Sequence, residues 1–88
     1  MLEILYFSAP WCGPCKALKP SIEKIESELD SSKIKIHKIN VDDSPIETTA
    51  YSISSVPTFI FLKDGERVHS FTGVKSIKEI QTLISTWS

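Results

Sequence analysis

The sequence predicts an α/β fold of order βαβαββα, with a four-stranded mixed sheet and helices on both of its faces. Short runs rich in β-branched and aromatic residues alternate with segments whose apolar residues recur at steps of three and four. The pair Asp64-Gly65, typical of a tight hairpin, separates the last two of these runs. Because a chain of 88 residues supports only one core, we expect a single domain over residues 1–88.

The first strand and helix are predicted from residues 3–30. Residues 3–7 are an almost continuous apolar run, typical of a central strand covered on both faces, and Ser8-Ala9-Pro10 ends it. The next helix is expected to begin beside Cys12 and to end near Asp30. Pro20 lies inside it, and because the apolar stripe continues we expect a kink rather than a stop. The stripe consists of Cys15, Leu18, Ile22, Ile25 and Leu29.

Residues 33–41 alternate in β-branched residues and predict a second strand, in which Lys38 shares a face with Ile34 and Ile36. Ser44-Pro45-Ile46-Glu47 has the pattern of a capping box with proline at the first helical position, which predicts a short helix to about Tyr51.

The remaining elements are two strands and a helix. Residues 58–62 and 67–71 are expected to pair antiparallel across the Asp64-Gly65 turn. A second capping box, Ser76 to Glu79, opens the last helix. Its apolar stripe is Ile77, Ile80, Ile84 and Trp87. Right-handed crossovers make the first two strands parallel neighbours, so the sheet order is 2-1-3-4 and a site is expected at the carboxyl end of strand one, beside Cys12.

Composition excludes several classes of function. Ten Lys/Arg against eleven Asp/Glu give a net charge of -1, which lacks the excess of positive charge expected of a nucleic-acid binder. No run approaches the roughly 18 apolar residues of a membrane span. The apolar run at residues 1–7 is too short for a signal peptide and has no basic leader, so we expect a cytoplasmic protein.

The only two cysteines, Cys12 and Cys15, are separated by two residues at the start of the first predicted helix. A helix N-terminus carries free N–H groups and partial positive charge, which stabilise a thiolate. One helical turn brings the two sulfurs within bonding reach. We therefore expect Cys12 to be the exposed nucleophile and Cys15 the sheltered resolving thiol of a disulfide-exchange reaction.

Three interpretations of Cys12 and Cys15 other than redox chemistry are possible. A structural disulfide closing so small a ring removes little chain entropy, and a reducing cytoplasm would open it. A zinc site needs about four ligands, and only His37 and His69 remain, on different predicted strands. An inert buried pair is the third alternative. The motif's place, after an apolar strand and at the opening of a helix, favours redox chemistry.

Residues 11–16, Trp-Cys-Gly-Pro-Cys-Lys, resemble the active-site signature of the thioredoxin family. Pro20 resembles the family's helix-kinking proline, residues 38–42 its second shared strand, and Val56-Pro57-Thr58 the loop facing the cysteines. The resemblance implies a minimal thioredoxin fold of the size of a glutaredoxin, because thioredoxins usually begin with an extra strand and helix.

The resemblance also implies contacts with a substrate. A cis Val56-Pro57 bond would bring the Val56 backbone beside Cys12, where a substrate strand adds by main-chain hydrogen bonds. From the residues alone, Pro57 is equally an ordinary strand-initiating proline, Gly73 a plain turn glycine, and Trp11 a shielding side chain. The expected substrate-binding residues are Trp11, Gly13, Pro14, Val56, Pro57 and Gly73.

Tyr6 departs from the family, which keeps a buried aspartate at that position below the cysteines. Tyrosine titrates near about 10 and is a poor base at neutral pH. The sequence therefore does not identify the group that accepts the proton of Cys15. Lys38, which would neighbour that acid, either pairs elsewhere, helps hold thiolate charge, or extends to solvent. Tyr6 and Lys38 are therefore candidate tuning residues.

Our leading hypothesis is a monomeric thiol–disulfide oxidoreductase that reduces disulfides in partner proteins and is recharged by a reductase of the thioredoxin-reductase type, with no metal or bound cofactor. Gly13-Pro14 resembles the strongly reducing members. A glutathione-dependent, glutaredoxin-like enzyme is one alternative, although that family typically has Pro-Tyr between its cysteines. A non-catalytic interaction module with this fold is the other.

Overall fold

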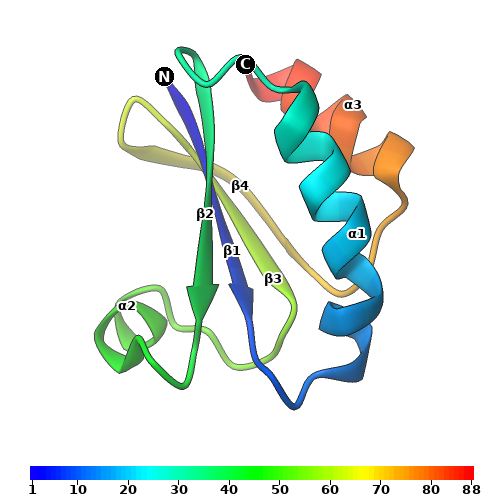
Figure 1. Ribbon diagram of the computed structural model, residues 1–88. Helices are drawn as coiled ribbons and strands as arrows, with labels where there is room; N and C mark the ends of the chain where they lie inside the picture. The colour runs from blue at the N-terminus through cyan, green and yellow to red at the C-terminus, as the bar shows by residue number, and fades with distance from the viewer.

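The computed structural model describes residues 1–88 and confirms the predicted order of elements (Figure 1). The sheet has the order β2-β1-β3-β4, with β1 parallel to β2 and antiparallel to β3, and with β4 antiparallel to β3. The strands are β1 (Leu2–Ser8), β2 (Ile34–Asn40), β3 (Thr58–Lys63) and β4 (Glu66–Thr72). The helices are α1 (Gly13–Glu28), α2 (Pro45–Ala50) and α3 (Ile77–Trp87).

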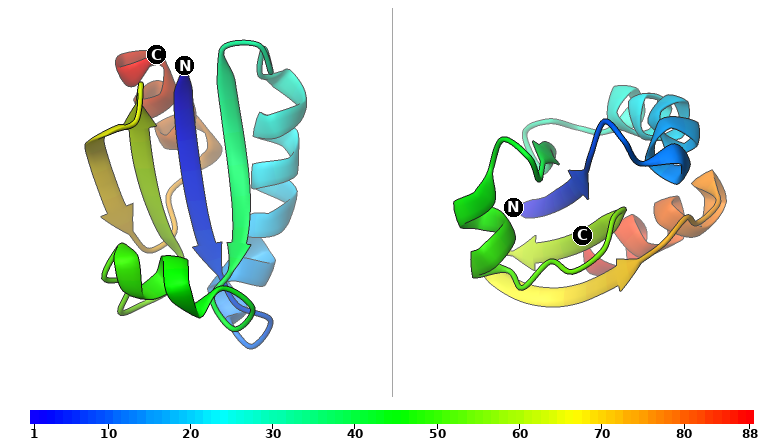
Figure 2. Two further views of the ribbon diagram at one scale, coloured as in Figure 1. Left: turned by 90° about the vertical axis from the view of Figure 1, so that its left-hand side faces the viewer. Right: turned by 90° about the horizontal axis from the view of Figure 1, so that it is seen from below.

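Strand β1 is the centre of the fold because its alternating side chains enter two separate apolar clusters. Ile4 and Tyr6 point to the face covered by α1 and α3, whereas Leu5 and Phe7 point to the opposite face. On that opposite face, Tyr51 and Ile53, which follow α2, pack against the sheet. The two views of Figure 2 show α1 and α3 on one side of the sheet and the smaller α2 at its lower end. The predicted placement of helices on both faces is confirmed.

Helix α1 ends two residues earlier than predicted and continues through Pro20 without interruption. Its buried residues are Cys15, Leu18, Ile22 and Ile25, which is the predicted stripe without Leu29. Leu29 is the C-cap, in extended conformation, and packs only partly buried against the cluster under α1 and α3. The prediction that Pro20 would not stop the helix is confirmed, because burial of the stripe outweighs the lost backbone hydrogen bond.

The turn between β3 and β4 has the conformation that its sequence predicts. Asp64 and Gly65 have φ values of 51° and 85°, as the central residues of a type I′ turn require. The register of β3 with β4 shifts between Phe61 and Leu62, so that Phe61 lies opposite His69 and Leu62 opposite Arg67. This irregularity leaves β4 well paired on both sides of it.

Two serines stand at helix N-caps, and only one of them makes the predicted capping box. At α3 the Ser76 hydroxyl accepts a hydrogen bond from the Glu79 N–H, and the Glu79 carboxylate accepts one from the Ser76 N–H. At α2 the helix and its Pro45 are as predicted, but Ser44 makes no side-chain cap. The capping box predicted there is wrong, because Ser44, at φ -130° and ψ 61°, is not in the extended conformation that turns a cap hydroxyl toward the helix.

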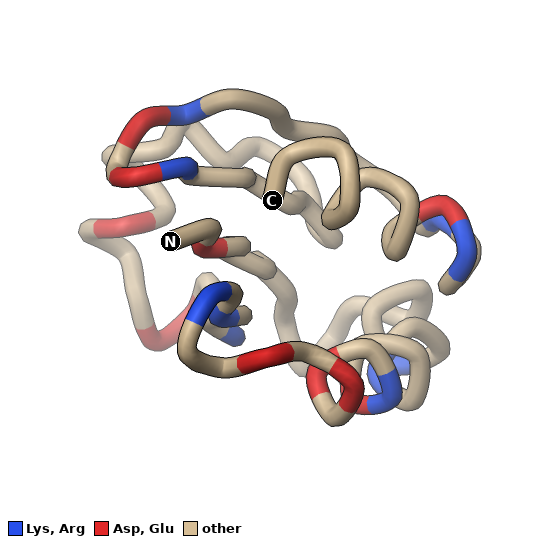
Figure 3. The backbone as a smooth tube through the Cα atoms, turned by 90° about the horizontal axis from the view of Figure 1, so that it is seen from above, with Lys and Arg blue, Asp and Glu red and all other residues tan.

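None of the three helices has the length and apolarity that crossing a membrane requires. The charged residues are distributed along the chain with both signs interspersed, as Figure 3 shows for the end that carries the termini. The net charge of -1 therefore reflects positive and negative residues that alternate over the surface, and no large region of one sign is visible from this end.

Replacing Ser76 by alanine is expected to lower the free energy of unfolding by about 0.5–2 kcal/mol, because the Glu79 N–H in the first turn of α3 loses the Ser76 hydroxyl that caps it. Ser44→Ala is the matched control and should cost clearly less, since its hydroxyl caps nothing. Urea denaturation of the two variants and the parent measures the difference. Equal losses in the two variants would contradict the distinction between the caps.

Candidate active site

The site lies where the chain leaves the carboxyl end of β1 and enters α1, as predicted. After Ser8 the chain turns through Ala9, and the Cys12 N–H donates a hydrogen bond to the Ala9 carbonyl at 3.1 Å. Cys12 is the N-cap of α1, and Gly13 and Pro14 form the exposed first turn. A central strand that is buried on both faces therefore fixes the position of the helix N-terminus.

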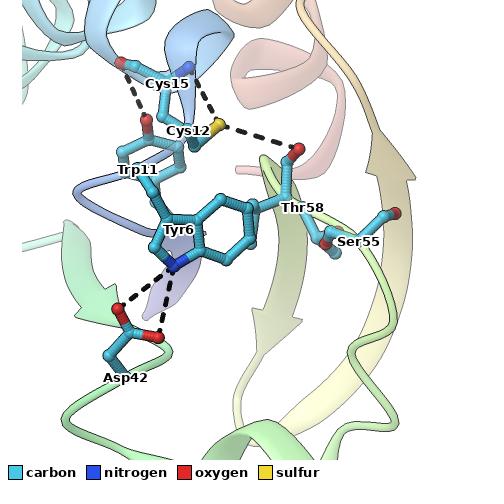
Figure 4. Close-up of a disulfide and its surroundings, with 8 residues drawn as sticks. Tyr6, Trp11, Cys12, Cys15, Asp42, Ser55 and Thr58 are labelled. Carbon is cyan, nitrogen blue, oxygen red and sulfur yellow. Dashed lines mark hydrogen bonds between the residues drawn. A yellow bond between two sulfur atoms is a disulfide. The ribbon is translucent and has the colours of Figure 1, made fainter.

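Cys12 and Cys15 are joined by a disulfide bond, with Cα atoms 5.2 Å apart, inside the range that suits such a bond. The Cys12 sulfur also caps the helix, since the Cys15 N–H donates a hydrogen bond to Cys12 Sγ at 3.2 Å (Figure 4). An anion at this position gains about 0.3–1 kcal/mol from the helix dipole, and up to about 2 kcal/mol when partly buried. The geometry thus favours the thiolate form of Cys12 once the disulfide is opened.

The expectation that Cys12 is exposed is wrong for the oxidised protein. Cys12 and Cys15 are equally buried, with 4% and 5% of their surfaces exposed. Ala9 belongs to the same small cluster, and Val41 and Val56 pack against it. Spacing on a helix could not show this burial, because the covering residues come from the ends of β1 and β2 and from the loop before β3.

The loop before β3 reaches over the cysteines, and the bond between Val56 and Pro57 is cis, which confirms that prediction. The Val56 carbonyl oxygen lies 3.8 Å from Cys12 Sγ. The Thr58 hydroxyl donates to the Ser55 carbonyl at 2.7 Å, and the Gly73 N–H donates to the Pro57 carbonyl at 2.9 Å. Gly73 has a φ of 90°, which favours glycine and brings it against this loop.

Trp11 is 68% exposed, so it is not packed over the start of α1 as a shielding residue would be. Its indole N–H points to the Asp42 carboxylate, with Nε1 3.2 Å from Oδ2 and 3.4 Å from Oδ1 (Figure 4). Asp42 was not among the site residues predicted from the sequence. A signal was available: Asp42 follows β2 as Trp11 follows β1, and the carboxyl ends of parallel neighbours lie at the same edge of the sheet.

Tyr6 and Lys38 lie opposite each other in the register of β1 with β2, on the face that α1 covers. The Tyr6 hydroxyl donates to the Cys15 carbonyl at 3.5 Å, and its ring stacks on Phe59 with centroids 4.8 Å apart. The Lys38 ammonium pairs with the Glu26 carboxylate at 2.9 Å. Of the three roles considered for Lys38, pairing elsewhere is therefore the one that this structure shows.

Burial raises the pKa of the Tyr6 phenol, and its interaction with the Ser8 side chain offsets only part of that rise. The phenol consequently stays protonated through the neutral range and does not act as a base there. Tyr6 supplies a hydrogen-bond donor to the Cys15 carbonyl and an aromatic ring that stacks on Phe59, at the position where the resemblance to the thioredoxin family implied an aspartate.

No group of three or more His, Cys, Asp or Glu residues lies close enough together to hold a metal ion. His37 Nε2 lies 3.1 Å from Glu3 Oε1, and the His69 ring stacks on Trp87 with centroids 5.9 Å apart. Trp87 is thus a packing residue of α3, as expected from its place on the apolar stripe.

Comparisons with known proteins agree with this geometry. The family model described as Thioredoxin matches residues 2–86. A thioredoxin of Chlamydia caviae is 41% identical over 87 residues, which cover 99% of this chain and 83% of the relative. A thioredoxin of Bacillus subtilis is 42% identical over 79 residues, or 90% and 75% of the two chains. The X-ray structure of Fasciola hepatica thioredoxin superposes with a TM-score of 0.89 at 31% identity, over 99% of this chain and 81% of that one.

Tyr6→Phe is expected to reduce the loss of stability at alkaline pH. Because the pKa of Tyr6 is higher in the folded than in the unfolded protein, its contribution is complete below the unfolded value and disappears as pH rises through the folded one. Urea unfolding between about pH 8 and pH 11 measures this slope. Tyr51→Phe removes the hydroxyl of the other tyrosine and is the matched control. Identical slopes for Tyr6→Phe and the parent would contradict the assignment.

Proposed function

This chain belongs to the thioredoxin family and is a protein-disulfide reductase, and we propose that Cys12 and Cys15 perform the exchange in two ordered steps. The observation that carries the proposal is the Cys12–Cys15 disulfide at the N-terminus of α1, with Cys12 Sγ accepting the Cys15 N–H. The sulfur that caps the helix is the one whose negative charge the helix dipole stabilises.

In the first step, the Cys12 thiolate attacks one sulfur of a substrate disulfide. A bond forms between Cys12 and that sulfur, the substrate S–S bond breaks, and the second substrate sulfur leaves as a thiolate that takes a proton from water. In the second step, the Cys15 thiolate attacks Cys12 Sγ and forms the disulfide seen here. The first substrate sulfur leaves as a thiolate, and the substrate has gained two electrons from the protein.

We propose that substrates dock beside Cys12, on the surface formed by the substrate-binding residues predicted from the sequence. Neither the N–H nor the carbonyl of Val56 takes part in a backbone hydrogen bond, so both are free to pair with an extended substrate segment. Trp11, which precedes Cys12, and Gly73, whose N–H bonds to the Pro57 carbonyl, are both exposed and available to a substrate. Gly13 and Pro14 are also exposed, and no atom lies within 4 Å of the position that a side chain on Gly13 would take, so the first turn of α1 beside Cys12 is open to a substrate.

Family membership supports disulfide-containing proteins as substrates and a reductase as electron source. The finer proposal is a dedicated reductase of the thioredoxin-reductase type, acting on a monomer in the cytoplasm. Gly13-Pro14 between the cysteines supports this assignment over glutathione. The proposal that the protein is a monomer rests on the few large apolar side chains that are exposed, which are Met1, Trp11, Ile46 and Val74.

Replacing Cys15 by serine is expected to trap substrates, because the mixed disulfide on Cys12 then has no resolving thiol. Incubation with cytoplasmic proteins followed by nonreducing electrophoresis should show covalent adducts that disappear with dithiothreitol. Cys12→Ser is the matched control and should give almost none. If Cys12→Ser traps adducts as well as Cys15→Ser does, or alkylation at mildly acidic pH labels Cys15 first, the assigned order of the two thiols is wrong.

The electron source is tested by the rate at which the oxidised protein is reduced. We expect a thioredoxin reductase with its nicotinamide cofactor to reduce the pair at a rate at least about tenfold above that of millimolar glutathione, because Cys12 is nearly covered and small thiols gain no docking contacts there. Stopped-flow measurement of thiol formation gives both rates. Faster turnover with glutathione would favour the glutaredoxin-like alternative.

A further inference from the structure

A cavity of about 410 Å³ lies between β1, β2 and the start of α1, and Cys15 is part of its lining. Its charged lining is entirely positive, because Lys16 and Lys19 of α1 and Lys38 of β2 contribute to it and no Asp or Glu does. Lys38 is bound to Glu26, whereas Lys16 and Lys19 take part in no ion pair. The ammonium groups of Lys16 and Lys19 therefore have no carboxylate partner, and both residues line the same cavity as Cys15.

The second exchange step needs a proton acceptor near Cys15, since only the thiolate is nucleophilic. None of the side chains that line the cavity can serve at neutral pH. Lysine ammonium groups have no acceptor, the Tyr6 phenol keeps its proton, and the hydroxyl of Ser8 and the amide of Asn40 are not bases at that pH. No histidine or carboxylate lies in the lining, and the Glu26 carboxylate that meets Lys38 is engaged in that ion pair.

We propose that a small oxyanion from solution, such as hydrogenphosphate or a carboxylate, occupies this lysine-lined cavity and takes the proton of Cys15 during resolution. The inference rests on the proposed function, because it concerns the second step of that exchange. The oxyanion gains the proton, Cys15 Sγ forms its bond to Cys12 Sγ, and the substrate thiolate departs. The protonated anion then exchanges with the solvent.

Size and charge both suit such a ligand. A water molecule takes about 30 Å³ of liquid, so the cavity admits an oxyanion together with several waters. Lys16 and Lys19 are three residues apart on α1 and so project from one side of the helix. The Ser8 hydroxyl and the Asn40 amide add neutral donors between the two strands. The positive lining selects an anionic base over a neutral or cationic one.

The test separates the two exchange steps with dithiobis(nitrobenzoate), an aryl disulfide that releases the coloured thiolate thionitrobenzoate, used at one equivalent with the reduced protein. Attack by Cys12 releases the first thionitrobenzoate, and attack by Cys15 releases the second. In stopped flow at neutral pH, inorganic phosphate is varied at constant ionic strength, which holds screening fixed. We expect the second phase to accelerate by about threefold or more and then to saturate, while the first phase is unchanged.

Two controls make the test specific. Imidazole, a neutral base of similar basicity, should accelerate the second phase much less per mole of base. The double variant Lys16→Gln, Lys19→Gln should lose most of the phosphate dependence of that phase. The matched double variant Lys24→Gln, Lys35→Gln removes the same charge from exposed positions outside the cavity and should keep it.

The outcomes distinguish this inference from the proposed function. A missing first phase would contradict the proposed function itself. A normal first phase with a second phase that ignores phosphate, or that responds equally to imidazole, would overturn only the oxyanion site. Acceleration of both phases alike, or an unchanged phosphate dependence in the Lys16, Lys19 variant, would overturn it too.

Discussion

The hydrogen bond from the Cys15 N–H to Cys12 Sγ is the interaction on which the chemistry of this protein depends. It makes one sulfur the N-cap of α1, where an oxygen-bearing side chain would ordinarily stand. Because the helix dipole acts only over the first turn, the reactive sulfur has to lie at the cap itself. The two intervening residues then place Cys15 within bonding reach and at the start of the buried stripe.

Strand β1 holds this cap in place because it is fixed on every side. It pairs with β2 and β3 and carries apolar clusters on both faces. Parallel pairing with β2 brings Asp42 to the indole of Trp11 at the same edge of the sheet. Antiparallel pairing with β3 makes the Val56-Pro57 loop approach from the opposite direction and end beside Cys12. The site therefore needs both kinds of pairing around one central strand.

Features set by periodicity and local turn chemistry could be predicted from the sequence, whereas features set by contacts between elements could not. The stripe of α1, the Asp64-Gly65 turn and the Ser76 capping box each depend on a few neighbouring residues, and all three are present. The cover over Cys12 depends on Val41 and Val56, which are 15 residues apart and meet only in the folded chain. Ser44 fits the capping pattern, but its backbone conformation, set by the turn from β2, prevents the bond.

Tyr6 shows how the core and the chemistry compete for one position. Its ring stacks on Phe59, which in turn stacks on Phe71, so it continues an aromatic row across β1, β3 and β4. A carboxylate there would forgo that stacking and would carry the cost of burial. The aromatic choice strengthens a small core, but it removes a fixed base from beneath Cys15. The proton must then leave through the lysine-lined cavity between β1, β2 and α1, whose positive charges attract anions that can accept it.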